Sequence, residues 1–134
     1  MRRLTGRRVL IVEDEAMIAL LMEQVLLDAG ATVLGPVHSM AGALAMLTVN
    51  KPDAAVLDMN LNGTSAAPVA DAFATLGVPF VVVTGYGKSA VPSGHPGVPV
   101  LDKPYDPDEL IVALVTLLSQ HSRSTAAPLP DPSS

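Results

Sequence analysis

The sequence contains no cysteine, which excludes a disulfide framework and any metal site built on thiolate ligands. A chain without cysteine suits a reducing compartment, and we expect the protein to be cytoplasmic. No signal peptide is apparent, because the apolar run after the first arginines is short and is interrupted by Glu13, Asp14 and Glu15. No apolar stretch has the length that a membrane span requires, so we expect no membrane partner.

Positive charge and aromatic residues are also scarce. Eight lysine and arginine residues stand against thirteen acidic residues, which gives a net charge of -5. A nucleic-acid surface needs a positive footprint, so this charge argues against nucleic-acid binding. We interpret the cluster of Arg2, Arg3, Arg7 and Arg8 as a solvated terminus, and residues 1–7 as an N-terminal extension. With two Tyr, two Phe and no Trp, the core must be aliphatic.

Short aliphatic runs instead alternate with helical patterns along the chain. Continuous apolar runs are typical of parallel strands covered on both faces, and this alternation indicates βαβ units. We predict one domain at residues 8–121 and a disordered tail, rich in Ser, Thr, Pro and Ala, at residues 122–134. The predicted strands are 8–13, 32–35, 54–58, 80–84 and 98–102, and the predicted helices are 15–28, 40–49, 68–76 and 107–120.

The segment between Gly85 and Pro99 differs from the other connections. Its glycine and proline residues leave little room for a full helix. We therefore predict a loop or a single short helical turn where this type of fold has its fourth helix. The last helix has clear start signals: Asp106 as N-cap, Pro107 in the first turn and Glu109 completing a capping box.

Polar residues stand where four of the strand-like runs end. Glu13 and Asp14 follow the first run, Asp58 the third, Thr84 the fourth and Lys103 the fifth. Ligands of open α/β sheets bind at the carboxyl ends of the strands, so these side chains are expected to converge. Three carboxylates repel one another without a cation, and Mg²⁺ prefers such oxygen ligands, so we predict a Mg²⁺ site.

This predicted site has the groups that phosphoryl transfer to a carboxylate needs. A carboxylate is a nucleophile for phosphoryl groups when the negative charges of both are offset. Lys103 would supply a positive point charge, and Thr84 a hydroxyl hydrogen bond. Each residue alone has an ordinary interpretation, with Asp14 as a helix cap and Lys103 as a loop lysine. The combination at four strand ends favours the functional interpretation.

With these residues, the sequence resembles the receiver domain of bacterial two-component response regulators, over about Arg8 to Gln120. The resemblance rests on the run from Val9 to Glu15, Asp58, Thr84-Gly85 and Lys103-Pro104-Tyr105. It implies a flavodoxin-like, doubly wound sheet of five parallel strands in the order 2-1-3-4-5, with helices on both faces. The resemblance also implies that Asp58 accepts a phosphoryl group from a histidine kinase, which Thr84 and Lys103 then contact. It further implies that Asp14, Asp58 and the Asn60 carbonyl bind Mg²⁺, with Glu13 acting through a water.

Some features depart from the commonest receivers. Val100 stands where those receivers carry the aromatic residue that swings inward on activation, and Tyr86 is a candidate substitute. The run from Val78 to Gly87 resembles the single-domain FATGUY receivers, which work with HWE-type or related histidine kinases. After Asp58 we expect a short, mobile loop.

We therefore expect a stand-alone phosphoacceptor that signals through a conformational change to an unknown downstream protein, rather than an enzyme of the usual kind. Alternatives are an adaptor that works without phosphorylation and a phosphate sink for a shared kinase. A Mg²⁺-dependent phosphohydrolase is disfavoured because Asn60 occupies the position of the second acid that such an enzyme needs. A flavodoxin is disfavoured because acids follow the first strand, where that protein has its phosphate-binding loop.

The expected surfaces come from helix patterns. The exposed turns of the first helix are the expected contact for a kinase. Apolar residues of the last helix that fall off its core stripe, namely Ile111, Val112 and Val115, suggest a partner or self-association surface, and we expect a monomer or a weak dimer. His38, His95 and His121 lie apart and are interpreted as loop or surface residues rather than metal ligands.

Overall fold

The protein forms a five-stranded parallel sheet in the order β2-β1-β3-β6-β7, which is the predicted doubly wound order. The structure, a computed structural model, describes residues 3–85, 95 and 97–126, with side chains as far as residue 120. The strands of the sheet are β1 (Arg8–Val12), β2 (Thr32–Val37), β3 (Ala54–Asp58), β6 (Phe80–Thr84) and β7 (Val100–Asp102). In β3 and β6 every residue is buried, as expected for strands covered on both faces.

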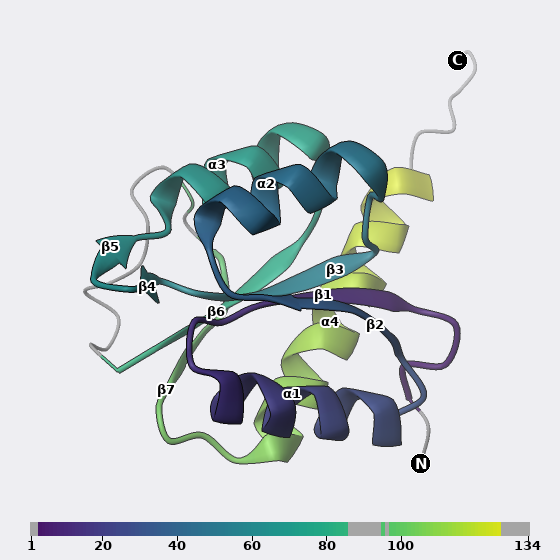
Figure 1. The fold of residues 1–134 in the computed structure, drawn as a ribbon. Coiled ribbons are helices and arrows are strands. Elements are labelled where there is room, and N and C mark those ends of the chain that lie inside the picture. The colour runs from purple at the N-terminus through teal and green to yellow at the C-terminus, as the bar shows by residue number, and fades with distance from the viewer. Residues whose placement is uncertain (1–2, 86–94, 96, 127–134) are drawn as a thin grey trace.

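Four helices within the described residues cover the sheet. They are α1 (Ala16–Asp28), α2 (Met40–Val49), α3 (Ala67–Leu76) and α4 (Pro107–Ala126). Helices α1 and α4 lie on one face and α2 and α3 on the other (Figure 1). The sheet therefore separates two apolar clusters, one below α1 and α4 and one below α2 and α3. Across the described residues, no helix combines the length and the apolar character needed to cross a membrane.

Local sequence signals explain where the helices start and stop. The Ser39 hydroxyl caps α2 by accepting a hydrogen bond from the amide of Gly42 at 3.0 Å. At the start of α4, Asp106 accepts from the amide of Asp108, and its own amide donates to Glu109, both at 2.9 Å, which confirms the predicted capping box. Gly77 ends α3 with a φ of 73°, a left-handed conformation that glycine adopts without strain.

The edge strand β2 contains one glycine that cannot be replaced without a clash. Gly35 has a φ of +84°, and an added Cβ would lie 2.7 Å from the amide nitrogen of Val37. The pairing register between β1 and β2 shifts at this point of the strand. Gly35 thus allows the edge strand to continue to Val37, further than the predicted end at residue 35.

Three parts of the chain differ from the sequence prediction. Leu4, inside the predicted N-terminal extension, is 1% exposed and belongs to the core under α1 and α4. Ile111 is also buried, whereas Val112 is 47% exposed, so the predicted apolar surface on α4 is smaller than expected. Helix α4 continues to Ala126, past the predicted boundary at residue 121. Leu4 was not predicted as core because a single aliphatic residue three positions before Arg7 and Arg8 is too weak a pattern.

The connection after Asp58 is also different. In place of the expected loop, β4 (Asn60–Leu61) and β5 (Thr64–Ser65) form a small antiparallel hairpin. The hairpin closes through Asn62 and Gly63, both with positive φ. Residues 86–94 and 96 lie outside the described part of the chain, and so do the predictions for Tyr86 and for most of the segment after Gly85.

The burial of Leu4 leads to a stability prediction. Replacing it with alanine, Leu4→Ala, removes core contacts and is expected to lower the free energy of unfolding by about 2–5 kcal/mol. The matched change Leu20→Ala, at a leucine of α1 that is 48% exposed, is expected to cost less than about 1 kcal/mol. Urea unfolding followed by circular dichroism measures both. Equal losses in the two variants would contradict the assignment of Leu4 to the core.

Candidate functional site

The carboxyl ends of the central strands bring the predicted site residues to one edge of the sheet. Because Val12 pairs with Leu57, the residues that follow β1 lie beside Asp58 at the end of β3. On the other side, Asp58 pairs with Val83, and Thr84 pairs with Asp102. A pocket of about 370 Å³ lies at this edge, and its lining residues are Asp14, Glu15, Asp58, Asn60, Gly85 and Lys103.

Lys103 is the positive centre of the site. Its Nζ donates to Asp58 Oδ2 at 3.1 Å and to Glu13 Oε1 at 3.2 Å. The Glu13 side chain is 0% exposed and the Asp58 side chain 5%, so both ion pairs are screened from water. Burial alone would lower the pKa of Lys103, but the hydrogen bond and charge of Asp58, together with Glu13, raise it above the ordinary value. The ammonium group therefore stays charged.

The three acids form a compact cluster. One carboxylate oxygen of each of Glu13, Asp14 and Asp58 lies within 4.8 Å of the others. Burial and the adjacent Asp58 carboxylate raise the pKa of Glu13 to about 8, more than the opposing Lys103 charge lowers it. Asp14 behaves differently: burial works against ionisation, but hydrogen bonds from the Asn62 amide and from neighbouring side chains lower its pKa.

Backbone amides of the β4–β5 hairpin orient two of the carboxylates. The amide of Asn60 donates to Asp58 Oδ1 at 3.0 Å, and the amide of Asn62 donates to Asp14 Oδ2 at 2.9 Å. The Asn60 side-chain oxygen in turn accepts from the amide of Gly63 at 2.8 Å. This role of Asn62 was not predicted, because it depends on the β4–β5 hairpin, for which the Asn62-Gly63 dipeptide was the available signal.

Two further residues belong to the site although the sequence did not predict a role for them there. Glu15 lines the pocket beside Asp14. Its position in the acidic run was a signal for this. His38 lies within 2.8 Å of the backbone oxygen of Glu13 through its Nδ1, so an imidazole supports the backbone that carries the buried acid. His95 lies elsewhere, paired with Asp71 at 2.7 Å, and the structure does not describe the side chain of His121.

Thr84 lies at the end of β6 next to the pocket. It is 1% exposed, and its backbone oxygen accepts from the amide of Lys103 at 2.8 Å. The pocket is lined by the next residue, Gly85, where an added Cβ would meet no atom within 4 Å. Space is therefore available in the pocket that Asp58 and Gly85 share.

The donor set suits a hard divalent cation. Three carboxylates have oxygens within 4.8 Å of one another, and two of them, Asp14 and Asp58, line the pocket with Asn60. They supply the oxygen ligands that Mg²⁺ prefers. Without such an ion, Lys103 supplies one positive charge beside Asp58 and Glu13, and the raised pKa of Glu13 favours its protonated form. The residues present therefore fit the predicted ion.

A parallel five-stranded sheet with an acidic cluster and a lysine at its carboxyl edge defines a receiver-type α/β protein. The response regulator receiver domain family matches residues 9–115, which is most of the chain. The chain therefore belongs to the response regulator receiver domain family of two-component systems.

Known proteins support this placement. The chain is similar to SdrG from Sphingomonas melonis Fr1, with 43% identity, a TM-score of 0.74, and coverage of 88% of this chain and 99% of that one. The response regulator PhyR from Brucella abortus has a TM-score of 0.82 and 25% identity, over 94% of this chain and 53% of PhyR. The transcriptional regulatory protein PdtaR of Mycobacterium tuberculosis is 28% identical over 126 residues, which are 90% of this chain and 60% of PdtaR. The chain thus spans little more than half the length of PhyR and PdtaR.

The raised pKa of Glu13 predicts how stability depends on pH in the absence of divalent metal. The folded protein holds a proton on Glu13 up to about pH 8, whereas an unfolded glutamate loses it near 4.5. The stabilising contribution is complete below pH 4.5 and is lost as the pH rises through about 8. In EDTA, the free energy of unfolding of the wild type should fall between about pH 5.5 and about pH 8.5.

Glu13→Gln should remove most of this fall, because the glutamine carries no titrating proton. The control Glu23→Gln, at a glutamate of α1 outside the acidic cluster, should retain it. Urea unfolding across this pH range measures the three proteins. An unchanged pH dependence in Glu13→Gln would contradict the assignment.

Proposed function

We propose that Asp58 accepts a phosphoryl group from a histidine kinase, and that Mg²⁺ is bound by Asp14, Asp58 and the Asn60 carbonyl, with Glu13 acting through a water. The observation that carries the proposal is the position of Asp58. It is a buried carboxylate that contacts Lys103 at 3.1 Å and also lines an open pocket beside two other acids. Such a group is both activated by charge and accessible from one side.

The bond changes in this proposal are a displacement at phosphorus. A carboxylate oxygen of Asp58 attacks the phosphorus atom, the bond from phosphorus to the kinase imidazole breaks, and the leaving imidazole takes up a proton. The ammonium of Lys103 then pairs with a phosphoryl oxygen, and Thr84 donates its hydroxyl hydrogen bond to another. A bound Mg²⁺ would offset the negative charge of the phosphoryl oxygens and of the acids. Water later cleaves the acyl phosphate slowly, so the protein is not an enzyme with an external substrate.

Helix α1 supports the proposal of a kinase as partner. Three large apolar side chains are exposed on it: Met17 (68%), Leu20 (48%) and Leu21 (60%). An apolar helical surface that begins beside the pocket suits a helix of a phosphodonor protein. We also propose that this kinase is of the HWE type or a related one. This part of the proposal rests on the sequence of residues 78–87 and not on the contacts of the site.

Two other functions use the same fold. An adaptor that works without phosphorylation would need neither the acidic cluster nor Lys103, and both are assembled in this chain. A phosphate sink would use the same acceptor chemistry, but it would pass no signal to a downstream protein. Phosphotransfer from kinases followed by capture of partners, with and without beryllofluoride, separates the sink from the signal carrier.

The phosphoacceptor is tested by a pair of Asp to Asn changes at the two ends of the same strand. Asp58→Asn is expected to abolish incorporation of phosphate from acetyl phosphate with Mg²⁺, because an amide is not a nucleophile for this transfer. Asp53→Asn, before the other end of β3, should incorporate phosphate like the wild type. Intact-protein mass spectrometry measures the adduct. A stable adduct in Asp58→Asn would contradict the proposal.

The proposed ion is tested separately by binding. If Mg²⁺ binds only the folded protein, a concentration ten times its Kd should stabilise the wild type by about 1.4 kcal/mol. Asp14→Asn should lose most of this gain, whereas the control Asp28→Asn, at the far end of α1, should keep it. Thermal unfolding with Mg²⁺ or EDTA gives the comparison. The same gain in Asp14→Asn would exclude Asp14 as a ligand.

A further inference from the structure

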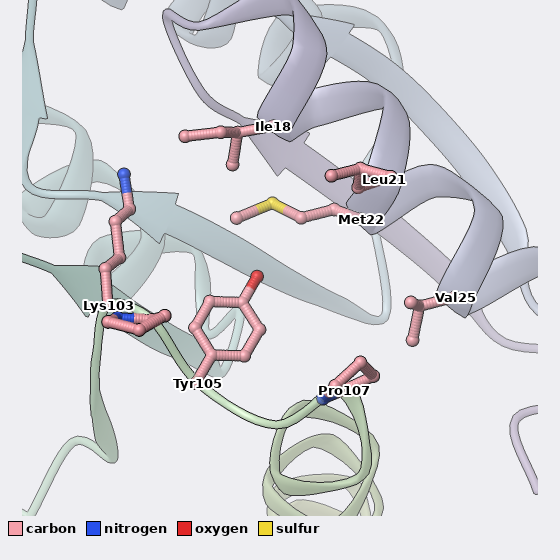
Figure 2. Close-up of a pocket in the computed structure, with 8 residues that line it drawn as sticks. Ile18, Leu21, Met22, Val25, Lys103, Tyr105 and Pro107 are labelled. Atoms are coloured by element: carbon pink, nitrogen blue, oxygen red, sulfur yellow. The ribbon is translucent and has the colours of Figure 1, made fainter.

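Tyr105 lies between the site and helix α1, on the loop that joins β7 to α4. Its ring is partly buried against the core under α1 and α4 and lines an apolar cavity of about 390 Å³. Figure 2 shows the ring below α1, with its hydroxyl group directed toward that helix and the Lys103 side chain to the left of the ring. The remaining lining residues come from α1 and from both sides of the tyrosine: Ile18, Leu21, Met22, Val25, Pro104 and Pro107.

The hydroxyl group of Tyr105 has no hydrogen bond to any residue that the structure describes. Burial and the negative charge of Glu13 raise the pKa of Tyr105 to about 12, so the hydroxyl is neutral. The apolar pocket of about 390 Å³ beside Tyr105 is open to solvent on one side, so the ring has room to change position.

A short, stiff connection links this ring to the site. Only Pro104 stands between Tyr105 and Lys103, and a proline ring restricts the backbone φ. Lys103 is held at both ends, through its amide to Thr84 and through its ammonium to Asp58 and Glu13. A change in the ionic partner of Lys103 therefore reaches the backbone of Tyr105 over two residues.

Strand β7 itself has no aromatic residue that could connect the site to a helix. The position that the sequence singled out, Val100, is aliphatic and packs against the cluster under α2 and α3. Tyr105 packs on the other face of the sheet, against α1. An aromatic group beside the site is thus present, but it faces the opposite apolar cluster.

We propose that Tyr105 couples the state of Asp58 to the surface of α1. When Lys103 exchanges its contact with Asp58 for a phosphoryl oxygen, the segment from Lys103 to Tyr105 shifts and the ring moves in the cavity. The packing of Ile18 and Leu21 then changes, and with it the apolar surface of α1. This inference rests on the proposed phosphoacceptor function, and it assigns the output of the site to the α1 face.

The chain contains three isoleucines, so the methyl signal of each can be followed separately by NMR. Ile18 lines the cavity, whereas Ile111 lines a different pocket at the far end of α1. Beryllofluoride with Mg²⁺ is the probe, and the amide signal of Met59, next to the acceptor, reports that it has bound. In the wild type, the Met59 amide and the Ile18 methyl group should both shift, and the Ile111 methyl group should stay in place.

Variants then locate the coupling. In Tyr105→Ala the Ile18 response should be lost while the Met59 response remains; if this variant does not fold, Tyr105→Leu takes its place. Tyr105→Phe, which keeps the ring, and the control Val100→Ala should both retain the Ile18 response.

Three results would overturn the inference. They are a wild-type Met59 response with no Ile18 response, an unchanged Ile18 response in Tyr105→Ala, and loss of that response in Tyr105→Phe. Absence of any Met59 response in the wild type would instead refute the phosphoacceptor function itself.

Discussion

The ammonium group of Lys103, placed between two buried carboxylates, is the interaction on which the rest of the site depends. Two acids with almost no exposure lie together at a sheet edge, where the charge of Lys103 and the raised pKa of Glu13 both reduce the repulsion between them. The contact also joins strand ends that are distant in sequence, because Glu13 follows β1, Asp58 ends β3 and Lys103 follows β7. One side chain thus supplies the positive charge of the pocket and connects the ends of three strands whose register the backbone pairing sets.

The remaining contacts show how the protein keeps this arrangement accessible. The hairpin amides of Asn60 and Asn62 use up one oxygen each of Asp58 and Asp14, so the carboxylates are oriented without being enclosed. Asp14, with its lowered pKa, stays ionised at the pocket, whereas Glu13 takes up a proton more readily because it is buried. The pKa values of the two acids that follow β1 are thus shifted in opposite directions, because Glu13 is buried and Asp14 lines the pocket.

Much of the fold and of the site could be predicted from the sequence because both follow from patterns of short range. Continuous apolar runs specified the central strands, and the polar residue after each run specified the site, since parallel strands end at a common edge. Contacts that depend on tertiary geometry were not predictable in this way. The burial of Leu4 and the hydrogen bond between His38 and the Glu13 backbone join segments whose local sequence carries no sign of the contact. The hairpin after Asp58 does have a local signal, the Asn62-Gly63 dipeptide, but its two strands are too short to form a recognisable pattern.

His95 connects the segment before β7 to α3 and β6. His95, shortly before β7, pairs with Asp71 of α3 at 2.7 Å, and its ring contacts Phe80 edge-on, with centroids 5.9 Å apart. Phe80 in turn lies 5.3 Å from Phe73 of the same helix. The residue that leads toward β7 is thus attached to both α3 and β6, on the face of the sheet opposite to Tyr105. The strand that ends beside Lys103 is therefore anchored on both faces of the sheet, by His95 on one and by Tyr105 on the other.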